Sequence, residues 1–548
     1  MPTCIHCKNK FEITNLEKNL LKKIDLPDPV ECPACRMQRR FSFRNERKLY
    51  YRRCDLTGKQ IVSIYAPDSK YKVYNQVDWY SDKWDAMDYG RDFDFNKSFF
   101  EQMNELMLAV PKCSAFVSNN QNSDYTNGAQ QDKDCYMIFV SDHDEDCYYS
   151  YGIDSCKDCL ECLNCYKSTL CIECVDCSDC YGVIMSEKSH NCSSSYFLSD
   201  CKNCKDCIAC YGLRGKKYCI LNEQYSREEY ETRKKELNMG NLDNLRQMKE
   251  FFEQKVNEQQ IHQYIDGNNN ENSTGDHIVG CKDCVECYDS GDLQDCSYLI
   301  FSFKSKDCSD GHVVVDNCEL CYETVSTINQ YNTQFTFASF YSKNSMYLDN
   351  CISCEDCFAC SGLRKKKYCI FNKQYSKEDY EALKAKIVEH MRKSGEWGRS
   401  FPTTISPFGY NETVAYEFFP LEKKEAVENG WKWHEEDKND SAYQGPKVEV
   451  PKDIKETNKD ITEKVLTCEK CSKLYKISPQ ELKLYKFHNI PVARSCFEDR
   501  HMARLSRRNP RKLWDRKCMK CGIELKSSYS PERPEIIYCE KCYLESVY

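Results

Sequence analysis

Cysteines separated by two residues are the feature that most constrains how this chain can fold. The 548 residues include 41 Cys, and many of them stand in Cys-x2-Cys steps. An odd number of cysteines cannot all form disulfides, and in a reducing compartment such steps more often mark metal sites. The segment after Met1 lacks the apolar core of a secretory signal. We therefore expect a cytoplasmic protein whose thiols stay reduced.

The two ends of the chain are copies of one module. Adding 464 to the number of an N-terminal residue gives its C-terminal counterpart, and residues 44–54 match residues 508–518 at seven of eleven positions. In both copies a hydroxyl residue, Thr14 or Ser478, stands three residues before a Glu. This spacing predicts a capped helix between two cysteine pairs.

Each module holds two potential sites of four ligands, and one site in each module is complete. Four thiolates at this spacing suit a tetrahedral Zn²⁺ and leave no position open for a substrate, as in a structural site. Such a metal stabilises a unit that is too small to fold well alone. The predicted zinc ligands are Cys4, Cys7, Cys32 and Cys35 in the N-terminal module, and Cys518, Cys521, Cys539 and Cys542 in the C-terminal module.

The other site of each module has lost ligands. In the N-terminal module only Cys54 remains, with Thr57, Asn75 and Asp78 at the other positions, and we do not expect this set to hold zinc. In the C-terminal module a third metal site is expected if a carboxylate or an imidazole, from Asp499 or His501, supplies the fourth ligand. Its other ligands are Cys468, Cys471 and Cys496.

A basic stripe runs through each module behind its first cysteine site. Residues 31–54 carry eight Arg or Lys against two Glu, interleaved with aromatic residues. Clustered cations bind phosphates and aromatic rings stack on bases, so the stripes suggest RNA or the ribosome as a partner. The competing interpretation is a solvated helix face, or a patch that docks on the acidic centre of the same chain. The candidate nucleic-acid-binding residues are Arg36, Arg39, Arg40, Arg44, Arg47, Arg52, Arg504, Arg508 and Arg511.

The central region contains a second duplication, at an offset of 150 residues. Residues 201–214 align with residues 351–364, and each copy continues into a helix that we expect to begin after Ser226 or Ser376. A polar segment, 267–275, separates the two copies and is predicted to be a loop.

Several central cysteines recur at intervals of 21 residues, as Cys135, Cys156 and Cys177 do, with short β-prone runs between them. Self-similarity near 20 residues is typical of stacked coils. We therefore expect a mainly β chain with α additions. It is predicted to be a Cys-laddered β-solenoid in two blocks, flanked by duplicated zinc-ribbon or treble-clef modules. Free cysteine behaves as a small hydrophobic residue, so the ladders need no metal.

These patterns divide the chain into segments. The predicted order is an N-terminal zinc module (1–80), a connecting helical segment (81–112), solenoid block 1 (113–225), a helical insertion and loop (226–275), solenoid block 2 (276–375), a helical or mixed segment (376–435), a linker (436–464) and a C-terminal zinc module (465–548).

Two other uses of the central residues stay open. Runs of four cysteines such as 156–165 resemble iron–sulfur motifs, but their last spacing is one residue short and no proline follows. They would also suit a thiol-rich store for soft metals. The acidic and aromatic stretch 78–92 would suit a β-helix enzyme acting on polysaccharides, with Asp82, Trp84 and Asp85 in a groove. Such a stretch is more often a docking segment.

Three segments resemble a family of zinc-ribbon, Cys-rich proteins from candidate-phyla bacteria of the Patescibacteria type. They are Arg44–Asp94, Gly212–Ser226 (GLRGKKYCILNEQYS) and Ser406–Trp433. The resemblance implies zinc-ribbon ends and a bacterial cytoplasmic setting, and it implies no established activity.

Together these features predict a non-enzymatic scaffold or interaction protein stabilised by two, or with the third site three, zinc ions. Its expected partner is a protein, RNA or the ribosome, and neither a membrane nor a small-molecule substrate is indicated. No phosphate loop, nucleophile elbow or zinc-protease motif is present in the sequence.

Overall fold

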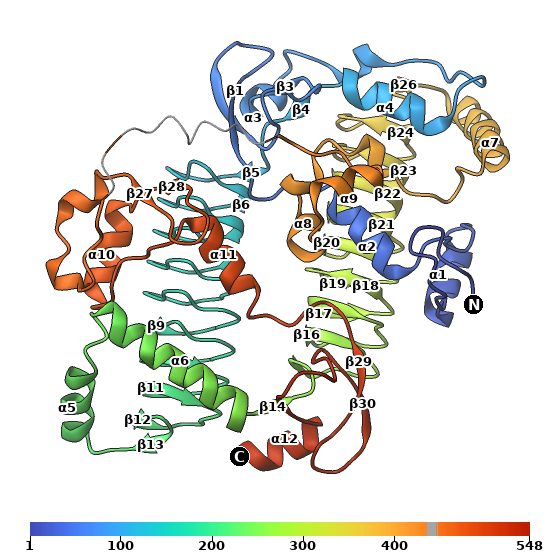
Figure 1. Cartoon of the computed structure of the whole chain (residues 1–548). Helices are drawn as coiled ribbons and strands as arrows, with labels where there is room; N and C mark the ends of the chain where they lie inside the picture. Colours follow the sequence, from blue (N-terminus) through green and yellow to red (C-terminus); the bar gives the residue numbers. More distant parts are fainter. Residues whose placement is uncertain (436–444, 446–447) are drawn as a thin grey trace. The chain divides into compact units, whose positions relative to one another are not determined.

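The computed structural model describes residues 1–435, 445 and 448–548 (Figure 1). It divides into two compact units. Unit 1 contains Met1–Ala115, Ile265–His434 and Pro510–Leu513, and unit 2 contains Phe116–Tyr264, Glu435–Asn509 and Trp514–Tyr548. The N-terminal module thus shares a unit with the second Cys-rich block, and most of the C-terminal module shares one with the first. The predicted linker 436–464 lies partly outside the described residues, at 436–444 and 446–447.

The repeating element of both Cys-rich blocks is a triplet of residues. Every third residue from Gln131 to Leu221 has a positive φ, between 46° and 65°. Asn and Asp tolerate this left-handed conformation better than other non-glycine residues, and they fill many of these positions. The residue after each left-handed residue is commonly a buried Cys, as in Asp158-Cys159 and Asp176-Cys177. The Asp-Cys steps of the sequence are therefore the corners of the coils.

Four triplets make one coil. Neighbouring strands pair in parallel with a shift of twelve residues, as Ser193 does with Tyr181 on one side and with Lys205 on the other. Isolated bridges continue the same shift where the strands are too short to be assigned, for example Leu160 with Ile172. The 21-residue recurrence predicted from the cysteines is thus not the coil length. It spans seven triplets and therefore repeats the inward-facing position without repeating the coil.

Coil stack 1, residues 116–224, belongs to unit 2 and ends in an antiparallel pair, β12 with β13. Its strands are β5 (Val117–Ser118), β6 (Asn127–Gln130), β7 (Phe139–Asp142), β8 (Tyr151–Asp154), β9 (Tyr181–Ile184), β10 (Ser193–Ser199), β11 (Lys205–Tyr211), β12 (Lys217–Ile220) and β13 (Glu223–Gln224).

Coil stack 2, residues 265–374, belongs to unit 1 and ends in the same way. Its first strand pairs with the second by parallel bonds, so the predicted loop 267–275 is wrong: part of it forms the first coil. The strands are β15 (Gly267–Asn268), β16 (Gly275–Val279), β17 (Cys287–Gln294), β18 (Ser297–Ile300), β19 (Phe303–Lys306), β20 (Ser309–Val315), β21 (Tyr322–Ile328), β22 (Tyr331–Phe340), β23 (Lys343–Asp349), β24 (Phe358–Ser361), β25 (Cys369–Ile370) and β26 (Lys373–Gln374).

The interior of the stacks is built from small side chains. A coil of twelve residues encloses a narrow core, and twenty buried residues of stack 1, sixteen of them Cys, form one cluster. The thiols meet backbone carbonyls in a regular pattern. Cys156 Sγ lies 3.6 Å from the carbonyl oxygen of Asp154 and 3.3 Å from that of Cys165. All 41 Cys are free thiols.

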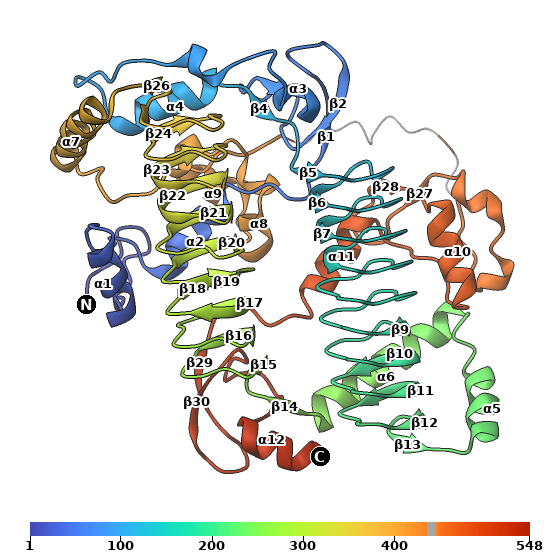
Figure 2. The same cartoon turned by 180° about the vertical axis from the view of Figure 1, so that it is seen from behind.

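Helices cover the last coils of each stack. Ser226 and Ser376 are the N-caps of α5 (Arg227–Leu237) and α7 (Lys377–Ser394), as predicted. The second duplication also survives in the packing, because Tyr218 meets Tyr230 and Tyr368 meets Tyr380 with ring centroids 5.7 Å apart in both copies. Figure 2 shows α7 and α4 (Phe99–Ala109) at one end of coil stack 2. In unit 2, α6 (Leu242–Gln259) packs on β10 and β11.

The remaining elements belong to the terminal modules and their connections. In unit 1 they are α1 (Asn15–Lys23), α2 (Pro33–Phe41), β1 (Tyr50–Arg53), β2 (Gln60–Ser63), β3 (Val73–Tyr74), α3 (Gln76–Trp79), β4 (Lys112–Cys113), α8 (Val414–Phe418) and α9 (Lys423–Glu428). In unit 2 they are β14 (Ile261–Gln263), β27 (Leu466–Thr467), β28 (Leu474–Tyr475), α10 (Pro479–Phe487), α11 (Phe497–Leu505), β29 (Trp514–Lys517), β30 (Glu524–Ser527), β31 (Ile536–Tyr538) and α12 (Glu540–Val547).

The prediction of a mainly β chain with helical additions is confirmed. Among the described residues, no helix combines the length and the apolar character that a membrane crossing requires.

Candidate metal centres and docking helices

Three groups of four side chains are brought together, and all three are built in the same way. A tight turn supplies the first Cys-x2-Cys pair, and the N-terminus of a helix supplies the other two ligands. Cys32, Cys496 and Cys539 are the N-caps of α2, α11 and α12. A helix N-terminus carries partial positive charge, which favours thiolates at that position. The groups are Cys4, Cys7, Cys32 and Cys35; Cys518, Cys521, Cys539 and Cys542; and Cys468, Cys471, Cys496 and Asp499.

The ligand atoms within each group lie within 4.8 Å of one another. The Sγ atoms of Cys7 and Cys32 are 3.7 Å apart, and those of Cys521 and Cys539 are 3.8 Å apart. Two sulfurs bound at about 2.3 Å to one tetrahedral ion would be about 3.8 Å apart. The two predicted cysteine quartets are therefore assembled with the spacing of a metal site.

The local electrostatics favour a thiolate at one cysteine of each complete quartet, Cys32 and Cys518. A hydrogen bond from Cys35 contributes most to lowering the pKa of Cys32, to about 5. Burial opposes ionisation of Cys518, but backbone N–H groups of Cys521, Cys539 and Lys520 lower its pKa to about 6. Backbone amides aimed at sulfur keep their role when the thiolate binds a cation.

The third group resolves the choice between Asp499 and His501. Oδ2 of Asp499 lies 3.0 Å from Sγ of Cys468 and 3.4 Å from Sγ of Cys496. His501 is buried elsewhere, with its ring 5.7 Å from that of Tyr151. Burial by itself would raise the pKa of Asp499, but hydrogen bonds from the three thiols lower it.

The site of the N-terminal module that has lost ligands retains the backbone arrangement of its C-terminal counterpart. Cys54 follows β1, and Asn75 caps α3 as Cys539 caps α12. The backbone N–H of Asn75 points at Sγ of Cys54, at 3.3 Å. Asp78 instead pairs with Lys83. These four side chains do not form a metal-binding group among the described residues.

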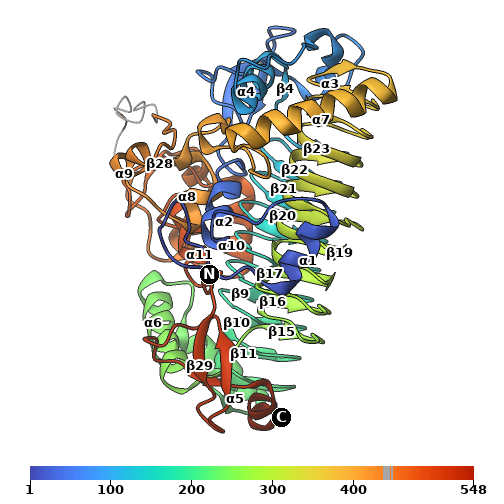
Figure 3. The same cartoon turned by 90° about the vertical axis from the view of Figure 1, so that its right-hand side faces the viewer.

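Three arginines of the N-terminal basic stripe lie on α2, which packs against β20 and β21 of coil stack 2 (Figure 3). Arg36 is 1% exposed; its guanidinium donates to Oδ1 of Asp310 at 3.0 Å and to Oε1 of Glu17 at 2.6 Å. Arg40 donates to the same Asp310 oxygen at 2.7 Å. Burial opposes ionisation of Asp310, but Arg36 and Arg40 lower its pKa below the ordinary value.

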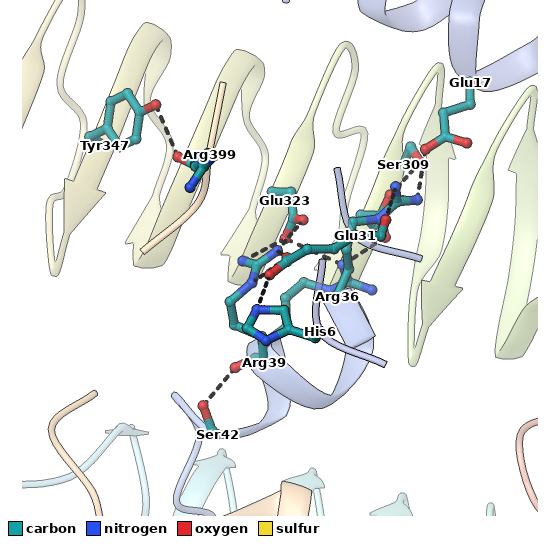
Figure 4. A network of polar contacts seen from close by, with 12 residues as sticks. His6, Glu17, Glu31, Arg36, Arg39, Ser42, Ser309, Glu323, Tyr347 and Arg399 are labelled. Carbon is teal, nitrogen blue, oxygen red and sulfur yellow. Dashed lines mark hydrogen bonds and ion pairs between the residues drawn. The ribbon is translucent and has the colours of Figure 1, made fainter. Parts of the chain in front are cut away.

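Figure 4 shows the outer part of this network. Arg39 contacts two carboxylates, with Nη2 2.7 Å from Glu323 and 2.8 Å from Glu31. His6 lies on the far side of Glu31, at 2.6 Å. Because His6 stands between Cys4 and Cys7, the network connects the first cysteine pair to α2, the helix that docks on coil stack 2.

The first arginines of the C-terminal basic stripe are buried in the same manner, on coil stack 1. Arg500 and Arg504 both pair with Glu161, which is 0% exposed, and Arg504 Nη1 lies 2.8 Å from Oε2 of that residue. Arg500 also reaches Glu481, at 3.1 Å. Further along the chain Arg508 pairs with Asp176, at 2.9 Å.

The two docking helices, α2 in unit 1 and α11 in unit 2, contact their coil stacks through corresponding residues. The offset of 464 relates Arg36 to Arg500, Arg40 to Arg504 and Glu17 to Glu481. The acceptors on the stacks also correspond in structure, because Asp310 and Glu161 are both left-handed corner residues with φ 57°. The same arrangement, in which two buried arginines of one helix pair with one carboxylate of a coil stack, is therefore present in each unit. We call it the arginine clamp.

The other candidate nucleic-acid residues also have partners within their own unit. Arg44 donates to Ser326, Arg47 to Glu417 and Arg52 to Asp55. Arg511 pairs with Asp289 and stands over the ring of Phe418, at 4.0 Å. The geometry favours the docking interpretation of the stripes over a nucleic-acid surface, because phosphates cannot reach guanidinium groups that are buried and already paired with carboxylates.

The stretch 78–92 packs on the last coils of stack 2. Trp84 is buried against Trp79, and the guanidinium of Arg364 stands 5.6 Å from the ring of Trp84. Asn372 donates to the carbonyl oxygen of Ala86 at 2.9 Å. Trp84 thus belongs to a packed end cover and does not line a groove with Asp82 and Asp85.

Sequence reasoning did not identify the acidic partners of the clamps. Glu17 and Glu481 stand out only as capping residues, and Asp310, Glu161 and Glu323 look like ordinary polar corners. One signal was available: Glu17 with Arg36 and Glu481 with Arg500 are retained together in both copies of the module.

Comparison with known proteins adds little to this geometry. No family model matches the chain, and no curated protein matches it. Among solved structures, a protein assigned as an acetyltransferase from Desulfovibrio desulfuricans G20 is similar over 48% of this chain and 69% of that chain, at 11% identity. The TM-score of 0.09 does not show a shared fold. The resemblance to the candidate-phyla family stays an expectation.

Proposed function

We propose that this protein is a non-enzymatic, zinc-stabilised scaffold of the bacterial cytoplasm. Its two coil stacks are taken as Cys-laddered β-solenoids, and its duplicated terminal modules as zinc-ribbon or treble-clef units that clamp them. The separation of 3.7–3.8 Å between ligand sulfurs is the observation that carries the metal assignment. Thiolates bind Zn²⁺ strongly, and four protein ligands leave no open position for chemistry.

The design of the clamps supports a structural role for the metal. In each unit the docking helix begins at a cysteine of the metal group and buries two arginines against one carboxylate of a stack. A bound ion would hold the first turn of that helix and so orient both arginines. We infer a protein partner in preference to RNA, because the candidate arginines of both stripes, such as Arg36 and Arg504, are already paired within the chain.

Metal content per chain tests the proposal. Protein purified without added metal is expected to contain two or three zinc ions by elemental analysis. Ten or more soft-metal ions would instead indicate a thiol-based store, and iron with acid-labile sulfide would indicate clusters. Either result would contradict the assignment of the inward thiols as packing residues.

Whether the chain binds two or three zinc ions depends on the third group, in which Asp499 is the candidate fourth ligand. Replacing Asp499 with alanine is expected to lower the zinc content by one ion per chain, because it removes the fourth ligand of the third group. Asp499→Cys is expected to keep the ion and to slow its loss to a chelator, since a thiolate is the softer ligand. Elemental analysis after dialysis measures both.

The matched control for these variants is Asp515→Ala. This carboxylate lies in the same module, exposed, and pairs with Lys526. Its removal should leave the zinc content unchanged. An Asp499→Ala protein that retains all of its zinc would show that this group holds no ion through the aspartate.

A further inference from the structure

A lysine and an aspartate that are 237 residues apart in the chain meet inside unit 1. Lys112 lies on β4, next to the N-terminal module, and Asp349 is the last residue of β23 in coil stack 2. Nζ of Lys112 contacts Oδ2 of Asp349. The two side chains are 1% and 0% exposed, so neither meets bulk water.

Two further polar side chains surround the pair, and each holds a different oxygen of the carboxylate. Ser361 Oγ lies 2.5 Å from Oδ2 of Asp349 and 3.3 Å from Nζ of Lys112. Nδ2 of Asn350 donates to the other oxygen, Oδ1, at 2.8 Å. Ser361 and Asn350 are themselves buried. The hydroxyl therefore bridges the amine and one carboxylate oxygen, while the amide polarises the other.

Two buried tyrosines lie beside this pair. The Lys112 ammonium stands 5.6 Å from the ring centroid of Tyr71. The hydroxyl of Tyr65 is buried without a hydrogen-bond partner among the described residues, and burial together with Asp349 raises its pKa well above the ordinary value. In such surroundings a buried ion pair is costly, because little water is present to solvate either charge.

We propose that Lys112 and Asp349 condense to an intramolecular isopeptide bond. Nζ of the lysine attacks Cγ of the aspartate, and negative charge develops on Oδ1, where Asn350 donates its hydrogen bond. Ser361 accepts a proton from Nζ and passes one to Oδ2. The C–Oδ2 bond then breaks and the oxygen leaves as water. Of the three ammonium protons, one stays on the amide and two leave with the oxygen, so no oxidant, reductant or activated co-reactant is required.

The bond would link the N-terminal segment covalently to coil stack 2. A cross-link between residues so far apart in the chain restricts the unfolded state strongly. It would retain the N-terminal module beside its stack when the metal group or the clamp of Arg36 opens. This inference does not depend on the proposed function or on any metal.

Mass spectrometry of the purified full-length chain tests the proposal. The intact mass is expected to be lower than the sequence mass by one water molecule, and proteolysis should release a branched peptide that joins Lys112 to Asp349. Lys112→Arg and Asp349→Ala should both restore the full sequence mass. A wild-type chain at its full sequence mass, after prolonged incubation of the folded protein, would overturn the proposal.

An isosteric variant separates bond formation from folding. Asp349→Asn offers the same carbonyl with ammonia as the leaving group, so its cross-linked product should have the same mass as the cross-linked wild type. Ser361→Ala should slow the loss of water without preventing folding. The matched control is Lys133→Arg, in an exposed pair with Glu145, which should keep the wild-type loss of one water.

Discussion

Replacing Glu161 with alanine is expected to destabilise unit 2 by about 3–5 kcal/mol, because it leaves the buried Arg504 without its paired carboxylate and the buried Arg500 with Glu481 alone. Arg500 and Arg504 both pair with this carboxylate. Burial raises the cost of each unpaired cation, and water cannot replace the lost partner without undocking α11. Hydrogen exchange of the α11 amides, combined with urea unfolding, measures the effect.

An exposed carboxylate of the same stack serves as the control for Glu161→Ala, because its loss does not affect the buried arginines. Glu145 lies on the surface of coil stack 1 between Lys133 and Lys157. Exposed pairs contribute little to stability, so Glu145→Ala is expected to leave the unfolding midpoint nearly unchanged. Equal effects of the two alanine variants would contradict a docking role for Glu161.

A charge-free clamp provides the second comparison. Changing Glu161 to leucine, Glu481 to glutamine, and Arg500 and Arg504 to methionine removes all four charges at once and keeps a capping residue at 481. Buried ion pairs are often replaced by packed apolar residues at little cost, so much of the lost stability should return. The corresponding experiment in unit 1 uses Asp310, which accepts from Arg36 and Arg40.

Loss of the first metal group is expected to undock the N-terminal module. In the zinc-loaded protein, Cys32→Ser should remove one ion per chain and leave α1 and α2 unprotected against hydrogen exchange. The reason is that Cys32 belongs to the first candidate metal group and is also the N-cap of α2. Structural zinc in small modules contributes about 10–16 kcal/mol of apparent binding free energy.

The matched control is a thiol inside coil stack 1. Cys174 is fully buried and lies near backbone carbonyls, and among the described residues it belongs to no metal-binding group. Cys174→Ser should therefore leave both the zinc content and the protection of α2 unchanged. If Cys32→Ser kept all of its zinc, or if Cys174→Ser lost an ion, the division between ligand and packing cysteines would be wrong.

The metal groups could be predicted because their geometry is local. Two cysteines that are separated by two residues point the same way when they lie in a tight turn or in the first turn of a helix. This orientation depends on local backbone geometry. Thr14 and Ser478 cap α1 and α10 as the sequence predicted. The identity of the fourth ligand in the third group was not local in this sense, and it needed the orientations of Asp499 and His501.

The coil length could not be read from the cysteines. An inward position recurs every three residues, so any multiple of three, including 21, repeats the composition. Only closure of the backbone on itself selects twelve, because it requires Ser193 to pair with Lys205 across the stack. The same long-range pairing turns part of the predicted loop 267–275 into a coil.

The sequence by itself determined which cysteines gather in the metal groups, where four of the helices begin and which segments are copies, since each of these depends on neighbours within a turn or a hairpin. The tertiary structure alone decided that the arginines face inward. Charge along a helix is the same whether its partner is a phosphate or Asp310, and the choice depends on a carboxylate some 270 residues away in the chain.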